Sequence, residues 1–390
     1  MQNTPRARLE QFSYLLQTAL FGRLELELGS LSEKGRLLVA VLAMVPLARW
    51  IAPQRGWRGR PSKDRQAVGA AFLAKAIYGL ETTRQVLERL HSDRQLRCLC
   101  GWNTVPEIPH ESTFSRAFAE FARSELPQRL HEALIEATHK DRLVGHIARD
   151  STAIEARERY PENPPAKPAR KRYKMGPKPK RSTPRSPRSR IEEQRSMPVP
   201  QILEELPRHC SLGVKKSSTG HLSYWRGYKL HLDVADGQIP ITALLTGACV
   251  HDSQVAIPLI SLTSQRVTYL YDLMDAAYDA QAIRAHSIAL GHCPLTELAQ
   301  RHRLIRTKVP IRKDSRVKKT VVTCEPLHRE LTWAEQDRMR ERTMIERVYS
   351  RLKDEFGARS IRVRGASKIM AHLMFGVLAL TVDQLLRLTG

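Results

Sequence analysis

Three acidic residues occur in settings that suit metal-assisted chemistry. Asp150 follows an apolar run in HIARDST, Asp275 follows one in VTYLYDLMDAAYDA, and Glu346 lies in RTMIERVYSRLK, which has helical spacing. Carboxylates bind Mg²⁺ or Mn²⁺, and two such ions about 3.5–4 Å apart stabilise the entering and departing oxygens of an in-line phosphoryl displacement. We therefore expect Asp150, Asp275 and Glu346 to be catalytic ligands of two metal ions in one active site.

The second carboxylate has two neighbours that compete for the same role. Asp272 lies within the apolar run that ends at Met274, and Asp279 lies in the helical segment that follows. Side chains an odd number of residues apart on a strand point to opposite faces, so Asp272 and Asp275 cannot both face one metal site. We choose Asp275, because it stands where the strand gives way to a loop.

The segment that carries Glu346 also carries two cations at helical spacing. Arg342 lies four residues before Glu346 and Lys353 seven residues after it, and at about 100° per residue all three share one face of a helix. We expect Arg342 and Lys353 to contact nucleic-acid phosphates beside the metal ions. The same spacing also suits an ordinary surface helix with salt bridges.

The charge of the chain indicates a polyanionic partner. The 390 residues include 64 Lys and Arg against 40 Asp and Glu, which gives a formal net charge of +24. Cations that replace the counterions condensed on phosphates favour binding to nucleic acid, so DNA is the expected partner. A ribosomal or membrane-surface protein is the alternative for such a charge, and the length and the acidic residues argue against the first.

Other chemistries have weak support in the sequence. Only Cys98 and Cys100 of the six cysteines lie close together, without the second pair or the histidines of a zinc site. The apolar run Leu37 to Ala48 is too short for a bilayer and predicts a buried helix. The first residues lack the apolar segment of a signal peptide. We therefore expect a cytoplasmic protein with no membrane contact.

The predicted elements would bring the carboxylates to one sheet. Apolar patterns predict four strands, over 144–150, 225–235, 239–247 and 267–274. The second and third form a hairpin across Asp236-Gly237, a strong turn signal. Helices are expected over 252–262 and 278–290, before the helix of Glu346. This order is that of an α/β fold with an RNase H-like mixed five-stranded sheet and flanking helices.

Residues 1–140 are predicted to form an all-α domain. Apolar residues recur at three-and-four spacing over 62–78, 81–91 and 112–122. Short helices with tight turns suit a helix-turn-helix-like DNA-binding domain, with exposed arginines at Arg84, Arg89, Arg94, Arg97 and Arg116. A helical bundle with a solvated basic face is an equal alternative. The catalytic domain is then placed at 141–390.

Two basic segments interrupt the predicted catalytic domain. Residues 157–200 are rich in Pro, Lys, Arg and Ser and lack apolar periodicity, which predicts a disordered insertion. Such a segment can contact phosphates without sequence preference, or it can be a linker only. Residues 301–330 are predicted to be a second basic insertion, between the sheet and the last helices.

At these motifs the chain resembles the DDE transposases of bacterial insertion sequences, in the group typified by insertion sequences four and five. RDST carries the first Asp, DAAYDA the second, and RTMIERVYSRLK the Glu. GYKLHLDVADGQIPITALLTGACVHDSQ resembles the hairpin of the family, and RVRGASKIMAHLMFGVLALTVDQLL its end. LAKAIYGLETTRQVLERL and ESTFSRAFAEFA resemble the domain before its core.

The last motif of that family is Tyr, two residues, Arg, three residues, Glu, six residues, Lys. Arg342, Glu346 and Lys353 keep this spacing, whereas Met339 stands at the Tyr position. A tyrosine function at that position is therefore not expected here, and the metal ligands are untouched by the change.

The resemblance implies a DNA transposase with two Mg²⁺ or Mn²⁺ ions. Such an enzyme hydrolyses DNA at terminal inverted repeats to free a 3′-OH, which attacks target DNA with no covalent protein–DNA intermediate. It also implies repeat recognition by the N-terminal domain and a homodimer or larger synaptic assembly at the bacterial nucleoid. An RNase H-like nuclease that never joins DNA, and an inactive DNA-binding derivative, are the alternatives. His251 and Asp252 in VHDSQ could lie near the site, but we favour a cap of the following helix.

Overall fold

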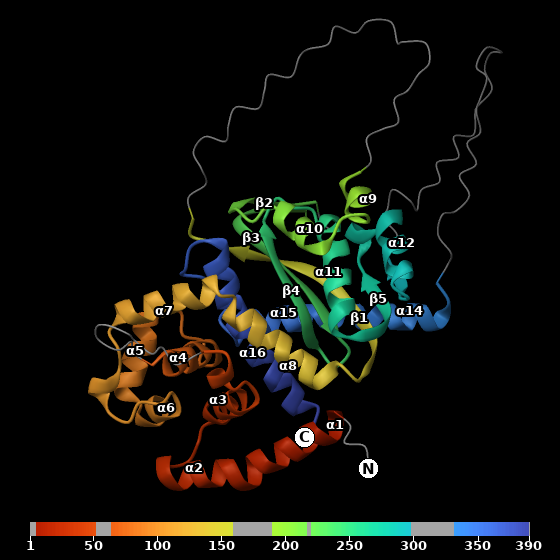
Figure 1. Cartoon of the computed structure of the whole chain (residues 1–390). Coiled ribbons are helices and arrows are strands. Elements are labelled where there is room, and N and C mark those ends of the chain that lie inside the picture. The colour runs from red at the N-terminus through yellow and green to blue at the C-terminus, as the bar shows by residue number, and fades with distance from the viewer. Residues whose placement is uncertain (1–4, 52–63, 159–188, 217–219, 298–330, 390) are drawn as a thin grey trace, which may run out of the picture.

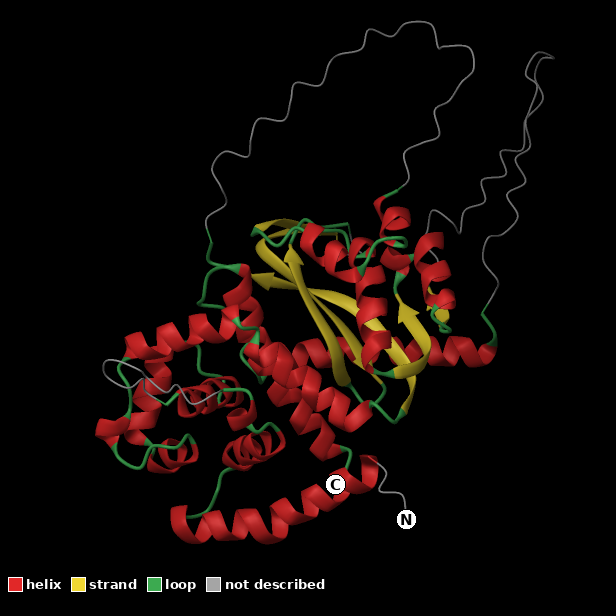
Figure 2. Cartoon of the chain, viewed as in Figure 1, coloured by secondary structure: helices red, strands yellow, loops and turns green. Residues whose placement is uncertain are grey.

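The computed structural model of the chain describes residues 5–51, 64–158, 189–216, 220–297 and 331–389. An all-helical region extends to His139, and a sheet with flanking helices follows it. Figure 2 shows the two regions beside each other, with all strands in the second. The predicted order of an all-α region before an α/β core is therefore confirmed.

The sheet is mixed and is built around β1 (Leu143–Glu155). This strand pairs antiparallel with β3 (Leu222–Ala235) and parallel with β5 (Thr268–Met274). On the outer sides, β4 (Ile239–Gly247) pairs with β3 and β6 (Cys293–Thr296) with β5. The order β4-β3-β1-β5-β6 is that of the expected five-stranded RNase H-like sheet.

One further strand and a turn complete the sheet. Strand β2 (Ser211–Lys216), which was not expected, pairs with the first half of β3. The predicted hairpin joins β3 to β4, and Gly237 in its turn has φ of 80°. A residue with a side chain is strained at this φ, so the glycine accounts for the turn.

Helices lie on both faces of the sheet (Figure 1). Helix α11 (Ser253–Arg266) contacts β3, β4 and β5, and α12 (Gln281–Ala289) lies beside it. On the opposite face, α15 (Met344–Asp354) contacts β1 and β3. The remaining elements of this region are short: α9 (Arg190–Gln194), α10 (Val199–Glu205), η4 (Ala276–Tyr278), α14 (Trp333–Arg340) and η5 (Glu341–Thr343).

The helical region contains the three helices expected from apolar spacing, α4 (Arg65–Ile77), α5 (Thr83–Ser92) and α7 (Glu111–Arg123). Its other helical elements are α1 (Pro5–Leu15), η1 (Leu16–Leu20), α2 (Phe21–Leu28), α3 (Glu33–Met44), η2 (Leu47–Arg49), α6 (Arg94–Leu99), η3 (Val105–Glu107) and α8 (Leu126–His139). Arg97 is buried and donates to the Leu90 and His91 carbonyls. The prediction that Arg97 is exposed is therefore wrong.

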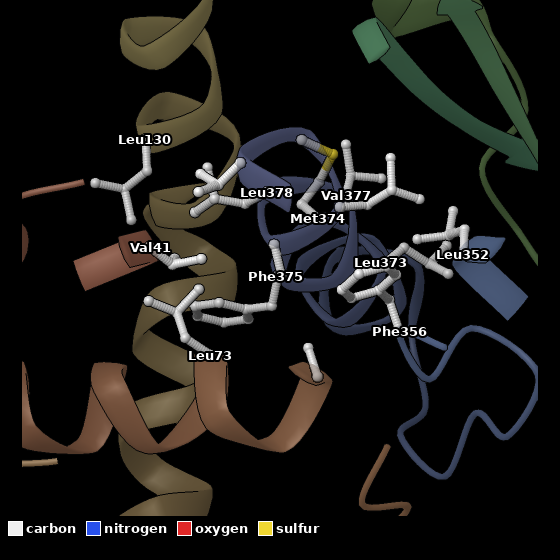
Figure 3. Packing of buried hydrophobic residues seen from close by; sticks show 14 of the residues in the cluster. Val41, Leu73, Leu130, Leu352, Phe356, Leu373, Met374, Phe375, Val377 and Leu378 are labelled. Atoms are coloured by element: carbon white, nitrogen blue, oxygen red, sulfur yellow. The ribbon is translucent and has the colours of Figure 1, made fainter. Parts of the chain in front are cut away.

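Helix α16 (Ala366–Arg387) joins the two regions into one core. It contacts α3, α4, α7 and α8 on one side and β4 and α15 on others. Figure 3 shows Phe375 and Leu378 of α16 pointing toward Val41, Leu73 and Leu130 of the helical region, with Leu373 near Leu352 and Phe356. Residues of both regions thus belong to one buried cluster, although the sequence predicted a domain boundary near residue 140.

The composition of α16 follows from this central place. A helix that is apolar on all sides must be buried or must lie in a membrane. By length and hydropathy α16 could cross a bilayer, but 78% of its most apolar stretch is buried against the rest of the protein. Helix α16 therefore packs here as a core helix.

The two predicted insertions fall mostly outside the described residues. Nothing is described of residues 159–188 or 298–330. The end of the predicted 157–200 segment is described, and it forms α9 and the start of α10. Ile191 and Met197 pack against a buried cluster that includes Ile257 of α11. The prediction of disorder is therefore wrong for residues 190–200.

Candidate active site

The strand register places Asp150 and Asp275 next to each other. Arg149 and Met274 are paired residues in the parallel β1–β5 ladder. Asp150 and Asp275 directly follow them. The two carboxylates therefore lie side by side, one on β1 and the other just after the end of β5. Strand β1 does not end at Asp150 as the apolar run suggested, since it continues to Glu155. It is β5 that ends at this level, at Met274.

Both carboxyl groups are harder to ionise than usual. Burial, with smaller contributions from the nearby charges of Asp275 and Asp252, raises the pKa of Asp150 to about 7, against a hydrogen bond from the Ser151 N–H that lowers it. Burial also raises the pKa of Asp275, whose Oδ1 accepts from the Ala277 N–H at 2.9 Å. Clustered carboxylates with raised pKa values are typical of functional sites, and a cation between them would stabilise both anions.

The two carboxylates that compete with Asp275 are already paired. Asp272 is fully buried, with its Oδ1 3.1 Å from Arg149 Nη1. Asp279 is buried and forms an ion pair with Arg284. Of these three, Asp275 is the one whose charge acts on Asp150.

A buried ion-pair network lies directly behind Asp150. Arg149 Nη2 is 2.7 Å from Asp233 Oδ2, and Asp272 binds the other guanidinium nitrogen. Thr263 donates to Asp233 at 2.6 Å, and Ser287 donates to Asp272 at 2.5 Å. Because successive side chains of a strand alternate, Arg149 points toward α11 and α12 while Asp150 points to the other face. The network therefore holds the backbone of β1 at the point where Asp150 projects.

Helix α15 lies across that other face and is attached to β1 at two points. The Tyr349 hydroxyl donates to the Asp150 carbonyl at 2.6 Å and accepts from the Leu232 N–H at 3.2 Å. Lys353 Nζ donates to Thr152 Oγ1 at 2.7 Å. Since Thr152 and Asp150 are two residues apart, they share the face that α15 covers.

Tyr349 gives a test of this attachment. Tyr349→Phe would leave the Leu232 N–H and the Asp150 carbonyl without this partner, at a cost of about 1–3 kcal/mol. We expect a lower melting temperature in thermal unfolding. Tyr349 is buried and its ring packs in the core, so phenylalanine preserves the packing. An unchanged melting temperature would show that the hydroxyl does not hold α15 to the sheet.

Arg342 lies close to both carboxylates at the start of this helix. Its charge lowers the pKa of Asp150 and of Asp275, although burial dominates in both. Its Nη2 is 3.3 Å from Glu297 Oε1, and its buried Nε has no hydrogen-bond partner among the described residues. Arg342 and Lys353 thus lie on the side of the sheet from which Asp150 projects.

Glu346 lies on the same side but is exposed. At about 100° per residue, Glu346, Tyr349 and Lys353 fall within an arc of roughly 60° on α15. Tyr349 and Lys353 bind β1, so Glu346 is on the same side of the helix, but no hydrogen bond or ion pair joins it to Asp150 or Asp275 within the described residues. Its side chain is solvent-exposed. Within the described ranges, no three His, Cys, Asp or Glu side chains are close enough to hold one metal ion.

Asp252 is a residue of this site that the sequence interpretation assigned to a helix cap. It stands at the cap position of α11, but its side chain makes no cap hydrogen bond. Its Oδ1 instead accepts from Ser151 Oγ at 2.8 Å and from Lys229 Nζ at 3.0 Å. The neighbouring His251 makes the cap interaction, because its Nδ1 accepts from the Ser253 N–H. Asp252 contacts the residue after Asp150, which no local pattern in VHDSQ reveals.

The residues present suit a hard divalent cation. Mg²⁺ keeps several waters and needs only one or two protein carboxylates. Asp150 and Asp275 supply two, on β1 and at the end of β5. Burial and mutual repulsion disfavour their charged forms in the protein alone. Glu346 belongs to a helix on the same side of the sheet, and its side chain is exposed.

Comparison with protein families gives two matches. Residues 146–382 match the model described as "Transposase DDE domain", and residues 26–120 match "Transposase domain (DUF772)". The first covers more than half of the chain and includes every candidate site residue. No curated protein and no solved structure matches the chain.

Proposed function

The chain belongs to the family of transposases with a DDE domain, and from this we propose that it cuts DNA at the terminal inverted repeats of a mobile element and joins the ends to target DNA. A DDE domain implies phosphoryl transfer on DNA. The observation that carries the proposal is that Asp150 and Asp275 lie side by side on adjoining segments of the sheet, and that α15 packs on the side to which Asp150 points.

Each residue has a defined part in the proposed reaction. Asp150, Asp275 and Glu346 hold two Mg²⁺ or Mn²⁺ ions, which when bound stabilise the entering and departing oxygens of the displacement. Arg342 and Lys353 bind the phosphates on either side of the reacting one, because a guanidinium and an ammonium both pair with phosphate oxygens. Hydrolysis frees a 3′-OH, which then attacks a phosphodiester of the target.

A strand-transfer assay tests this proposal. The full-length protein is incubated with Mg²⁺, a duplex that ends in the inverted repeats bordering its gene, and a supercoiled plasmid. We expect cut ends and then joined products. If the protein cuts DNA but joins neither these ends nor ends supplied already cut, an RNase H-like nuclease is favoured. DNA binding with neither cutting nor joining would favour an inactive derivative. The observation that favours this alternative is that the side chain of Glu346, the third expected metal ligand, is exposed.

We also infer the partners and the setting of the reaction. The helical region recognises the terminal repeats, and a homodimer or larger assembly holds two ends together. We propose that the chain belongs to the group of insertion sequences four and five and acts in the bacterial cytoplasm. The motif order and the net charge of +24 support these points.

The salt dependence of binding follows from the proposed DNA contacts. If six to ten phosphates are contacted, affinity should fall roughly 10³- to 10⁵-fold between about 50 and 200 mM salt, because released counterions drive binding. Fluorescence anisotropy of a labelled duplex over this range measures the slope. An affinity that stays constant would contradict a phosphate-based interface.

A further inference from the structure

A charged cavity lies between the helical region and the DDE domain, apart from the candidate active site. Its volume is about 450 Å³. Helices α4 and α7 and the turn before α5 form one wall, and residues 362–372 form the other. These segments lie far apart in sequence and meet where α16 begins.

Lys75 is the unusual residue of this cavity. It lies on α4, lines the cavity and is only 8% exposed, yet its ammonium group has no hydrogen bond or ion pair with any residue that the structure describes. The nearest opposing charge is that of Glu81, which forms ion-pair contacts with Arg362. Burial lowers the pKa of Lys75 to about 8. A positive charge on so largely buried a side chain is costly without a partner, and an anion in the cavity would supply the missing charge.

The rest of the lining also suits an anion. Arg362, Arg364 and Lys368 are further cations, against the carboxylates of Glu81 and Glu111. The hydroxyls of Thr83 and Ser115 line the same cavity and can donate hydrogen bonds. His372 is neutral, since burial lowers its pKa to about 3. Cations and hydroxyls that converge on one space form the usual surroundings of a phosphate group.

The geometry points to a phosphate-binding site formed by Lys75, Arg364 and Lys368, which takes a backbone phosphate of the bound DNA. The identification of DNA as the source of the phosphate rests on the proposed function. The location supports it, because a phosphate held here touches both the helical region and the segment that leads into α16. DNA bound at this site would therefore tie the two regions together.

Lys75→Met is the variant that separates this role from a structural one. Methionine is close in shape and carries no charge, so removal of the unpaired ammonium should raise the melting temperature of the free protein. The same variant should bind DNA roughly tenfold more weakly, since a hydrogen bond to a charged group is lost. The slope of log affinity against log salt should become shallower by about 0.9, the value for one phosphate.

The experiment uses the full chain and three probes: a fluorescein-labelled mixed-sequence duplex, inorganic phosphate and ATP. Lys368→Met, at an exposed position of the same cavity, should weaken duplex binding without affecting the fold. Lys140→Met is the control, because Lys140 is exposed directly after α8 and pairs with Glu136. Its duplex affinity should match that of the unmodified protein.

Two results would overturn the inference. If the duplex binds Lys75→Met and the unmodified protein equally, no DNA phosphate occupies the cavity. If phosphate or ATP raises the melting temperature of the unmodified protein but not of Lys75→Met, with equal duplex binding, the site takes a free anion instead. These experiments measure DNA binding and not DNA cleavage. They can therefore be interpreted even if the proposed cutting and joining reaction is not observed.

Discussion

Asp150→Asn, Asp275→Asn and Glu346→Gln are each expected to abolish Mg²⁺-dependent DNA cleavage while DNA binding survives. Each change keeps the shape of the side chain and removes the anionic oxygen that a hard cation requires. Metal ions contribute several kcal/mol to such a transition state, and about 1.4 kcal/mol corresponds to a factor of ten. The cleavage rate should therefore fall by roughly 10³-fold or more. Gel analysis of end cleavage and anisotropy of a labelled duplex measure the two activities.

The controls for this series come from the same elements. Glu341→Gln alters an exposed carboxylate one turn before Glu346 and on another face of the helix, so cleavage should be retained. Asp150→Asn should not lower the melting temperature without divalent ions, because the ionised carboxylate is disfavoured by burial and by Asp275 and Asp252. Loss of cleavage in this variant would then be chemical rather than a loss of fold.

A comparison of variants at Asp252 and Glu346 tests most directly whether Glu346 is the third carboxylate of the site. The charge of Asp252 acts on Asp150, and Asp252 is held by Lys229 and Ser151, whereas Glu346 is exposed. If Glu346→Gln cleaves at the normal rate and Asp252→Asn does not, the third carboxylate of the site is Asp252. If Asp150→Asn or Asp275→Asn loses DNA binding with normal cleavage, the whole assignment of roles is wrong.

The local parts of the fold could be predicted because their causes are local. Asp236-Gly237 requires a turn, and the apolar runs on either side require strands. The preference for Asp275 over Asp272 rested on alternation along a strand, and the structure pairs Asp272 with Arg149 on the face away from α15. These inferences need only neighbouring residues.

The parts that were missed depend on contacts between distant residues. Strand β1 continues past Asp150 because β3 pairs with it as far as Glu155, although the apolar run stops earlier. The role of Asp252 depends on Lys229, which the strand β3 carries to it. Likewise, the cavity around Lys75 exists only once α16 has packed into the helical region. Apolar spacing cannot show which helix fills which gap.

Arg149→Met is expected to cause the largest loss of stability of any change in the sheet. Arg149, Asp233 and Asp272 are all 0% exposed, and one guanidinium serves both carboxylates. Removal of one member of a buried ion pair costs about 3–5 kcal/mol, because the remaining charge cannot reach water. For a domain of this size the melting temperature should drop by roughly 10 °C. Thermal unfolding followed by circular dichroism measures this change.

The origin of that loss can be separated from the loss of packing. In the triple variant Arg149→Met, Asp233→Asn and Asp272→Asn, no buried charge of this network remains, so most of the lost stability should return. Arg340→Met is the matched control, since Arg340 pairs with Asp337 at an exposed position where such pairs contribute about 0–1 kcal/mol. If the triple variant is as unstable as Arg149→Met, the arginine acts through its packing, and the network does not hold Asp150 in place by charge.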